Sequence, residues 1–166
     1  MTYMKKIVPL IILALAISAY FLFSSPSFRP APALSMTAIS GQVIDTQKRN
    51  NKPLLLTFWA TSCSSCVKEM PHLIELQNQY GDLIDIAGIA MSYDNIQQIN
   101  EMIKRRQLNY HIVYDQKAEI ALSFGGIRLT PTSFLISQQG QIIYQKIGDI
   151  DFRKIKRILS ETSQQG

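Results

Sequence analysis

The two cysteines of this 166-residue chain, Cys63 and Cys66, stand two residues apart between an apolar segment and a helix start. Residues 53–60 form an uninterrupted apolar run of strand length, as expected for a strand buried on both faces. Residues 64–80 suit a helix, which is interrupted at Pro71. A fold for this chain must therefore accommodate a buried strand, two thiols and a helix in direct succession.

The remaining elements follow from apolar spacing and turn residues. Either Asp94 or Asn95 caps one of the helices, and Gly140 lies in a hairpin turn. We predict a short strand or hairpin at 37–45, strands at 85–91, 111–115, 132–137 and 141–147, and helices at 95–107, 117–124 and 151–161. Strands that alternate with helices, followed by a hairpin and a helix, favour an α/β layer fold.

The composition is that of a folded protein, with 46% hydrophobic and 17% charged residues. The length allows one domain and an appendage. A net charge of +5 raises the question of nucleic-acid binding. The basic residues are scattered, however, and the run at 104–106 has no interleaved aromatic side chains, so we expect no nucleic-acid partner.

The N-terminus departs from ordinary globular composition. Lys5 and Lys6 precede residues 7–23, which carry no charge. As a helix this run reaches about 25 Å, near the lower limit for crossing a bilayer core. The charge asymmetry places the N-terminus in the cytoplasm and the remainder outside. A signal peptide cleaved near 16–18 is the alternative to the retained anchor that we favour, and either one exports the domain.

We therefore divide the chain into three parts. Residues 1–23 are the membrane anchor or signal segment. Residues 24–35, with three prolines, form a stiff, extended linker that holds the domain away from the membrane. Residues 36–166 form the folded domain.

Three readings of the cysteine pair involve no redox chemistry. The thiols could be inert core residues, or a structural disulfide, although closing so short a loop removes little chain entropy. A zinc site would need two more ligands, and His72 and His111 are the only imidazoles, without finger-like spacing. We expect no metal.

The redox reading has a physical mechanism. A cysteine at a helix N-terminus lies near unpaired N–H groups and the positive end of the helix dipole, which favour its thiolate. Cys63 would then attack a substrate disulfide, and Cys66 would attack the Cys63 sulfur and release the reduced substrate. A C-x-x-C pair that follows a buried strand and precedes a helix is a strong signal for this chemistry.

The segment FWATSCSSCVKEMP, residues 58–71, resembles the active-site segment of the thioredoxin superfamily, most closely its membrane-anchored TlpA/ResA-like branch. This branch includes the cytochrome c maturation thioredoxins, and the match covers most of residues 36–162. The resemblance implies a thioredoxin-like fold with a central helix–strand insertion at 95–115.

The segment LTPTSFLI resembles the cis-proline segment of the same family. The resemblance implies a cis peptide at Thr130–Pro131, opposite the disulfide. It also implies that Trp59, Thr130 and Pro131 contact the substrate chain.

Three positions depart from the family pattern. Ser62 stands where tryptophan is common, the intervening pair is Ser64 and Ser65 where proline is frequent, and Thr57 occupies the position of the buried aspartate of thioredoxin. Glu69, one helical turn after Cys66, is the candidate substitute. In the resembled branch an acid here tunes the thiols and relays protons, whereas the alternative is an exposed glutamate.

These features together predict an exported, membrane-tethered thiol–disulfide oxidoreductase of the protein-disulfide reductase type. Its partners would be disulfide-bearing proteins, with cytochrome c maturation as a candidate process, and a membrane thiol protein that donates electrons. The catalytic domain would be extracytoplasmic. No Gly-rich phosphate loop or dinucleotide fingerprint is present, so we expect no organic cofactor.

Other functions remain open at this point. The thiolates and His111 could hold Cu(I) in a copper chaperone, because copper(I) favours soft sulfur ligands. A disulfide oxidase or isomerase would use the same thiols at a different redox poise. A peroxidase is disfavoured, because Ala60 stands where the peroxidatic cysteine normally has its threonine.

Overall fold

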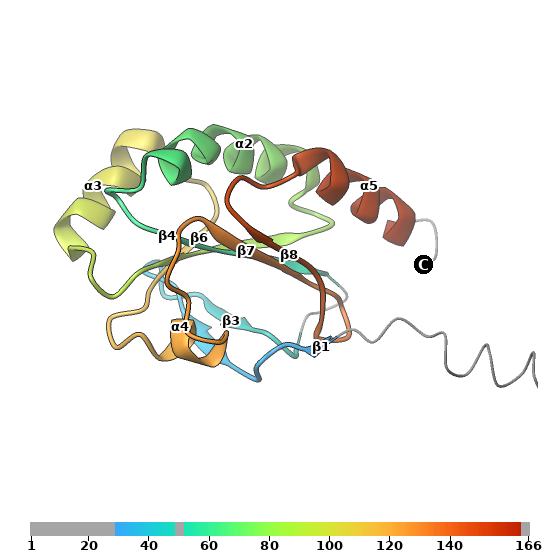
Figure 1. Cartoon of the computed structure of the whole chain (residues 1–166). Coiled ribbons are helices and arrows are strands. Elements are labelled where there is room, and N and C mark those ends of the chain that lie inside the picture. Colours follow the sequence, from blue (N-terminus) through green and yellow to red (C-terminus); the bar gives the residue numbers. More distant parts are fainter. Residues whose placement is uncertain (1–28, 49–51, 164–166) are drawn as a thin grey trace, which may run out of the picture.

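The structure, a computed structural model, describes residues 29–48 and 52–163 (Figure 1). Its main sheet has six strands in the order β1-β8-β7-β4-β5-β6. Strands β4, β5 and β6 run parallel, whereas β7 is antiparallel to both β4 and β8. The bounds are β1 Arg29–Pro30, β4 Leu54–Trp59, β5 Asp85–Ala90, β6 His111–Tyr114, β7 Thr132–Ile136 and β8 Gln141–Ile147.

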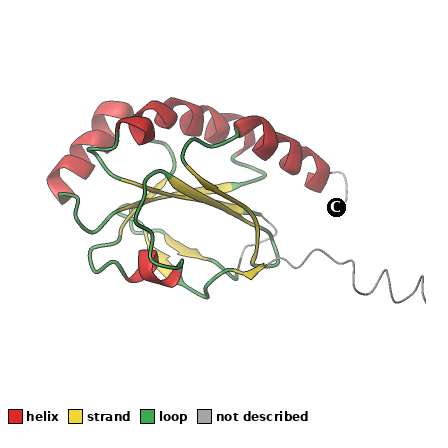
Figure 2. Ribbon diagram, viewed as in Figure 1, coloured by secondary structure: helices red, strands yellow, loops and turns green. Residues whose placement is uncertain are grey.

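Helices and a hairpin cover the two faces of this sheet. The long helices lie together on one face (Figure 2): α2 Ser64–Tyr80, α3 Ile96–Arg106 and α5 Phe152–Ser163. The opposite face carries the short helix α4 and a two-stranded hairpin: α4 Glu119–Ser123, β2 Ser35–Thr37 and β3 Val43–Asp45. The α/β layer fold is confirmed.

Strand β4 lies in the centre of the sheet, and all six of its residues are buried. Because successive side chains point to opposite faces, the strand contributes to two separate cores. Leu55 and Trp59 pack with residues of α2 and α3. Leu54, Leu56 and Phe58 pack with the hairpin and α4. This explains why the run is apolar at consecutive positions and confirms the predicted buried strand.

The expected insertion is present as helix α3 and edge strand β6. Of the two candidate caps of α3, Asn95 is the cap, because its side chain accepts hydrogen bonds from the backbone N–H groups of Gln97 and Gln98. Asp94 has another role in the structure, described below. The C-terminal end of α3 is closed by Gln107 in the left-handed conformation.

The structure places residues 29–35 against the domain, although we assigned them to the linker. Arg29 and Pro30 pair with β8, and the N–H of Ala31 donates to the carbonyl of Gly140 at 2.8 Å. Ala31 is buried, and Leu34 packs on the core of the α4 face. Backbone pairing and apolar burial thus hold this stretch on the sheet edge, where a free spacer would have neither.

The predicted membrane anchor at 7–23 and residues 24–28 of the linker lie outside the described residues. The three-part division of the chain therefore stays a prediction. Within residues 29–48 and 52–163, no helix has both the length and the apolar character needed to cross a membrane.

Candidate active site

Cys63 and Cys66 are joined by a disulfide at the start of α2. The chain leaves β4 at Trp59, turns, and reaches Cys63, which is the N-cap of the helix. The Cys63 Sγ atom accepts a hydrogen bond from the N–H of Cys66 at 3.2 Å. Cys63 is half-buried, whereas Cys66 is only 3% exposed. The geometry therefore leaves Cys63 as the sulfur that a partner can reach.

The peptide bond between Thr130 and Pro131 is cis, as the resemblance implied. Thr132, the first residue of β7, pairs with Phe58 near the end of β4. Pro131 therefore lies at the same end of the sheet as the disulfide. Its carbonyl accepts a hydrogen bond from the N–H of Gly148 at 2.8 Å. Next to it, Thr130 is half-buried and Leu129 is largely exposed.

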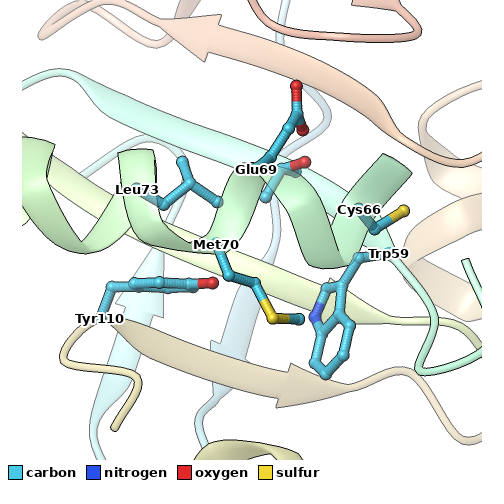
Figure 3. A pocket seen from close by; sticks show the side chains of 7 residues that line it. Trp59, Cys66, Glu69, Met70, Leu73 and Tyr110 are labelled. Carbon is cyan, nitrogen blue, oxygen red and sulfur yellow. The ribbon is translucent and has the colours of Figure 1, made fainter. Parts of the chain in front are cut away.

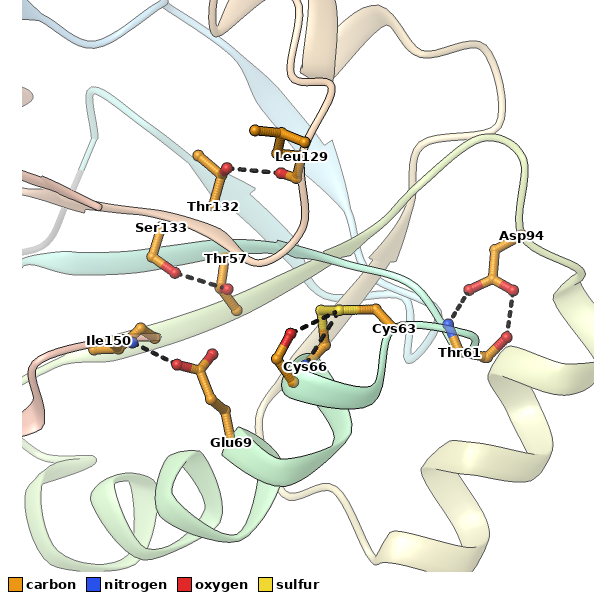
Figure 4. The surroundings of a disulfide bond; sticks show 11 residues. Thr57, Thr61, Cys63, Cys66, Glu69, Asp94, Leu129, Thr132, Ser133 and Ile150 are labelled. Atoms are coloured by element: carbon orange, nitrogen blue, oxygen red, sulfur yellow. Dashed lines mark hydrogen bonds between the residues drawn. A yellow bond between two sulfur atoms is a disulfide. The ribbon is translucent and has the colours of Figure 1, made fainter. Parts of the chain in front are cut away.

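Glu69 is buried, with 6% of its surface exposed, so it is not the exposed glutamate of the alternative interpretation. Its Oε1 atom accepts a hydrogen bond from the backbone N–H of Ile150, in the loop before α5 (Figure 4). Burial raises the pKa of the Glu69 carboxyl and the nearby charge of Asp149 adds to this, while the hydrogen bond from Ile150 opposes it. The burial of this carboxyl therefore favours its protonated form more than water does.

A small cavity of about 10 Å³ lies behind the disulfide, between α2 and the sheet (Figure 3). Both Cys66 and Glu69 line it, and the full lining is Thr57, Trp59, Cys66, Glu69, Met70, Leu73 and Tyr110. This volume is about what one water molecule needs. Cys66 of the disulfide and the buried Glu69 thus border the same small space.

Tyr110 is buried in the wall of this cavity. Burial raises the pKa of its hydroxyl, and the negative charge of Glu69 raises it further. The phenol therefore stays neutral, and Glu69 is the only carboxyl among the residues that line the cavity.

Trp59, which we expected to contact the substrate chain, is buried in the structure. Its indole is 4% exposed and packs between α2 and the sheet. Gly88 makes this possible, because a Cβ atom there would lie 3.0 Å from the Trp59 Nε1 atom. Among the described residues, Nε1 has no hydrogen-bond partner. The side chain belongs to the wall of the cavity and reaches no incoming chain in this arrangement.

Thr57 and Ser133 form a buried pair that the sequence did not reveal. The Ser133 hydroxyl donates to the Thr57 hydroxyl oxygen at 2.9 Å, between β7 and β4 (Figure 4). Thr57 occupies the position of the buried aspartate of thioredoxin and lines the cavity with Glu69. The Thr57 hydroxyl has its hydrogen-bond partner within the sheet. The only carboxyl among the residues that line the cavity is that of Glu69, on α2.

Neither histidine lines the cavity behind the disulfide. His72 is exposed, and its ring lies 5.4 Å from the ring of Phe152. His111 begins β6 and pairs with Ala87. The described part of the chain has no group of three or more histidine, cysteine or acidic side chains able to hold a metal ion, so Cys63, Cys66 and His111 form no such group.

Comparison with known proteins agrees with this geometry. The model of the Redoxin family matches residues 26–159. The chain belongs to the Redoxin family. It is 30% identical over 134 residues to thiol-disulfide oxidoreductase ResA of Bacillus thuringiensis subsp. konkukian, which covers 80% of this chain and 76% of that protein.

Solved structures of Redoxin-like proteins support the same conclusion. The crystal structure of StoA from Bacillus subtilis superposes with a TM-score of 0.68 at 29% identity, over 77% of this chain and 97% of that one. A thioredoxin family protein from Chlorobium tepidum superposes with a TM-score of 0.72 at 23% identity, over 84% and 99%, and shows the fold alone. The predicted thioredoxin-like fold is confirmed, as is the similarity to ResA.

The predicted enzyme class is confirmed as well. This Redoxin chain is a thiol–disulfide oxidoreductase of the ResA and StoA type, with Cys63 and Cys66 as its C-x-x-C pair. The separate roles that we assigned to these cysteines, and those of Glu69, Thr130 and Pro131, stay predictions.

Proposed function

We propose that this chain is an exported, membrane-tethered oxidoreductase that reduces disulfides in partner proteins. The unequal exposure of the two bonded sulfurs carries the proposal. Cys63 is half-buried at the helix start, while Cys66 is buried behind it. In such a pair the exposed sulfur can meet a second protein and the buried sulfur can reach only its neighbour.

The reaction begins with both thiols reduced. The Cys63 thiolate attacks one sulfur of the partner's disulfide, a mixed disulfide forms, and the partner's other sulfur leaves as a thiolate that takes up a proton. Cys66 then loses its proton and attacks the Cys63 sulfur, which releases the second partner thiol. The partner gains two electrons and two protons, and the chain is left with the Cys63–Cys66 disulfide.

In this proposal Glu69 takes the proton that Cys66 loses. Cys66 has almost no contact with solvent, so its proton needs an acceptor inside the protein. Glu69 shares the cavity with Cys66, and burial raises the pKa of this carboxyl. A base whose pKa approaches the working pH transfers protons most effectively.

The proposal also includes a membrane tether, an electron donor and a class of substrates. The apolar, uncharged segment at 7–23, preceded by Lys5 and Lys6, supports a tether with the domain on the outer side of the membrane. Repeated reduction outside the cytoplasm requires a thiol protein in the membrane as electron donor. The similarity to ResA supports specific protein disulfides as substrates, with cytochrome c maturation as the candidate process.

Trapping tests the reaction. In the full chain with Cys66→Ala, the mixed disulfide on Cys63 cannot be resolved and accumulates on partner proteins, visible on non-reducing gels and mapped by mass spectrometry. Cys63→Ala is the matched control and traps nothing. The proposal is abandoned if Cys66→Ala yields no Cys63-linked partner. Recovery of the wild-type chain in the soluble fraction after cell lysis would remove the tether.

The direction of electron flow is tested by the reduction potential of the pair. A reductase should have a potential near that of thioredoxin, about −270 mV, whereas a strong oxidase would lie nearer about −120 mV. Equilibration with glutathione or dithiothreitol buffers measures it. A value at the oxidising end would reassign the chain as a disulfide oxidase.

A further inference from the structure

The loop that carries Cys63 is held from the side by Asp94. Thr61, two residues before Cys63, donates its backbone N–H to Asp94 Oδ2 and its hydroxyl to Asp94 Oδ1, each at 2.6 Å (Figure 4). Gln98 Oε1 lies 3.3 Å from the same hydroxyl. Hydrogen bonds to a carboxylate are about twice as strong as neutral ones, and two of them to one residue also fix its orientation.

Asp94 is itself fixed by the inserted part of the fold. Its backbone N–H donates to the carbonyl of Met91 at 3.0 Å, and its carbonyl accepts from the Tyr114 hydroxyl at 2.9 Å. Its Oδ1 atom also accepts from the N–H of Asn95 at 3.0 Å. The carboxylate thus joins the loop before α2 to a rigid corner made by β5, the start of α3 and β6.

We propose that Asp94 is a positioning residue for Cys63, acting through Thr61. The helix start favours the Cys63 thiolate only while its sulfur faces the N–H groups of the first turn, as in the 3.2 Å contact from the Cys66 N–H. The two hydrogen bonds from Thr61 to Asp94, called the clamp below, hold the segment that leads into Cys63 in the direction that this contact requires. The inference rests on the proposed function, because it names a determinant of Cys63 reactivity.

Substitution of Thr61 gives the sharpest test, because it changes the hydrogen bond without changing the charge of any side chain. Thr61→Val keeps the shape and removes the hydroxyl donor, while Thr61→Ser keeps the donor. We expect Thr61→Val to lower the rate at which iodoacetamide modifies Cys63 in the reduced full chain by about fivefold, the effect of about one hydrogen bond. Thr61→Ser should restore the wild-type rate. Mass spectrometry of the Cys63 adduct measures both.

A double-mutant cycle separates the clamp from the charge of Asp94. Asp94→Ala removes both acceptors together with a negative charge near the thiol. If Asp94 acts through Thr61, then Thr61→Val has no further effect in the Asp94→Ala background. If Asp94 acts by charge alone, Thr61→Val retains its full effect there, and the inference is overturned.

Asn95→Ala is the control for damage to α3. It removes the helix cap, whose hydrogen-bond partners are the backbone N–H groups of Gln97 and Gln98. We expect a lower melting temperature and an unchanged Cys63 rate. An equal loss of rate in Asn95→Ala, or a wild-type rate in Thr61→Val, overturns the inference.

Failure of the proposed function and failure of the role of Asp94 give different results. Should Thr61→Val not fold, Thr61→Ala gives the same comparison, because it removes the same hydroxyl without added bulk. Wild-type Cys63 that resists modification, or a pair that does not re-form its disulfide, contradicts the proposed function. A reactive wild type with equally reactive clamp variants contradicts only the role of Asp94.

Discussion

The carboxylate of Glu69 accepts a hydrogen bond from the N–H of Ile150, a residue 81 positions later in the chain. This bond joins α2 to the loop before α5. Glu69 lines the cavity behind Cys66, and it also lines a surface groove of about 250 Å³ together with Lys68 and His72. Glu69 therefore borders both the cavity that Cys66 lines and a groove that opens to solvent.

Glu69→Gln should slow the step in which Cys66 resolves the mixed disulfide. Glutamine keeps the size and accepts the Ile150 hydrogen bond, but it takes no proton. A positioned base contributes about a hundredfold or more, so we expect a loss of at least about tenfold at neutral pH. Rapid-mixing kinetics with a disulfide peptide measure resolution, and alkylation of Cys63 is the control that should change little. Equal resolution rates would remove Glu69 from the reaction.

The stability of the oxidised protein should depend on pH through Glu69. The pKa of this carboxyl is raised on folding, mainly by burial, from an ordinary value of 4.5. The favourable contribution of the protonated form is complete below pH 4.5 and is lost as the pH rises through the raised folded value, because the unfolded chain ionises first.

Urea unfolding of the wild type and of Glu69→Gln at a series of pH values checks this dependence. The wild-type free energy of unfolding should fall relative to the variant as the pH increases across this window, and then run parallel to it. Two curves that stay parallel throughout would show that Glu69 ionises alike in both states.

Thr57→Val should destabilise the fold by leaving the Ser133 hydroxyl buried without its partner. A cost of about 1–3 kcal/mol is expected for such a group. The double variant Thr57→Val, Ser133→Ala should recover most of this loss, because both polar groups are then gone. Denaturant unfolding of the oxidised chains measures the cycle. Additive losses would mean that the two hydroxyls are not coupled.

Gly88→Ala should displace the indole of Trp59. A Cβ atom at this position would lie 3.0 Å from both Trp59 Nε1 and Ile112 Cδ1, so one of them has to move. Overpacking of this kind costs about 1–3 kcal/mol. Trp59 is the only tryptophan, so its fluorescence reports the shift directly. Gly88→Ala combined with Ile112→Val should recover part of the loss, and an unchanged spectrum would contradict the prediction.

Much of the fold was predictable from local patterns. The apolar run at 53–60, the helix at 64–80 and the hairpin around Gly140 all appear where apolar spacing and turn residues indicate them. Of the two candidate caps of α3, the structure selects Asn95. Two features differ from expectation. Helix α2 continues through Pro71 without the interruption expected there, and residues 29–35 join the sheet edge, because pairing with β8 depends on a strand more than a hundred residues away.

The sequence predicted the two thiols of the candidate site but not the interactions that surround them. The C-x-x-C pair and the cis-proline segment are continuous in sequence, so Cys63, Cys66 and Pro131 could be named beforehand. The interactions that surround them join distant segments, such as Glu69 with Ile150, Thr61 with Asp94, and Thr57 with Ser133. No local pattern encodes such pairs.

The amino-acid sequence by itself determined the order of strands and helices, the chemistry of the two thiols and the order in which they follow β4. These are consequences of residue type and spacing, which act within one turn or one strand. Only the tertiary structure decided which of the two sulfurs is the more exposed, which carboxyl lies buried in the cavity of Cys66 and which side chain accepts hydrogen bonds from Thr61 in the loop before Cys63. Burial and hydrogen bonding across the sheet depend on how segments pack, and packing exists only once the whole domain has folded.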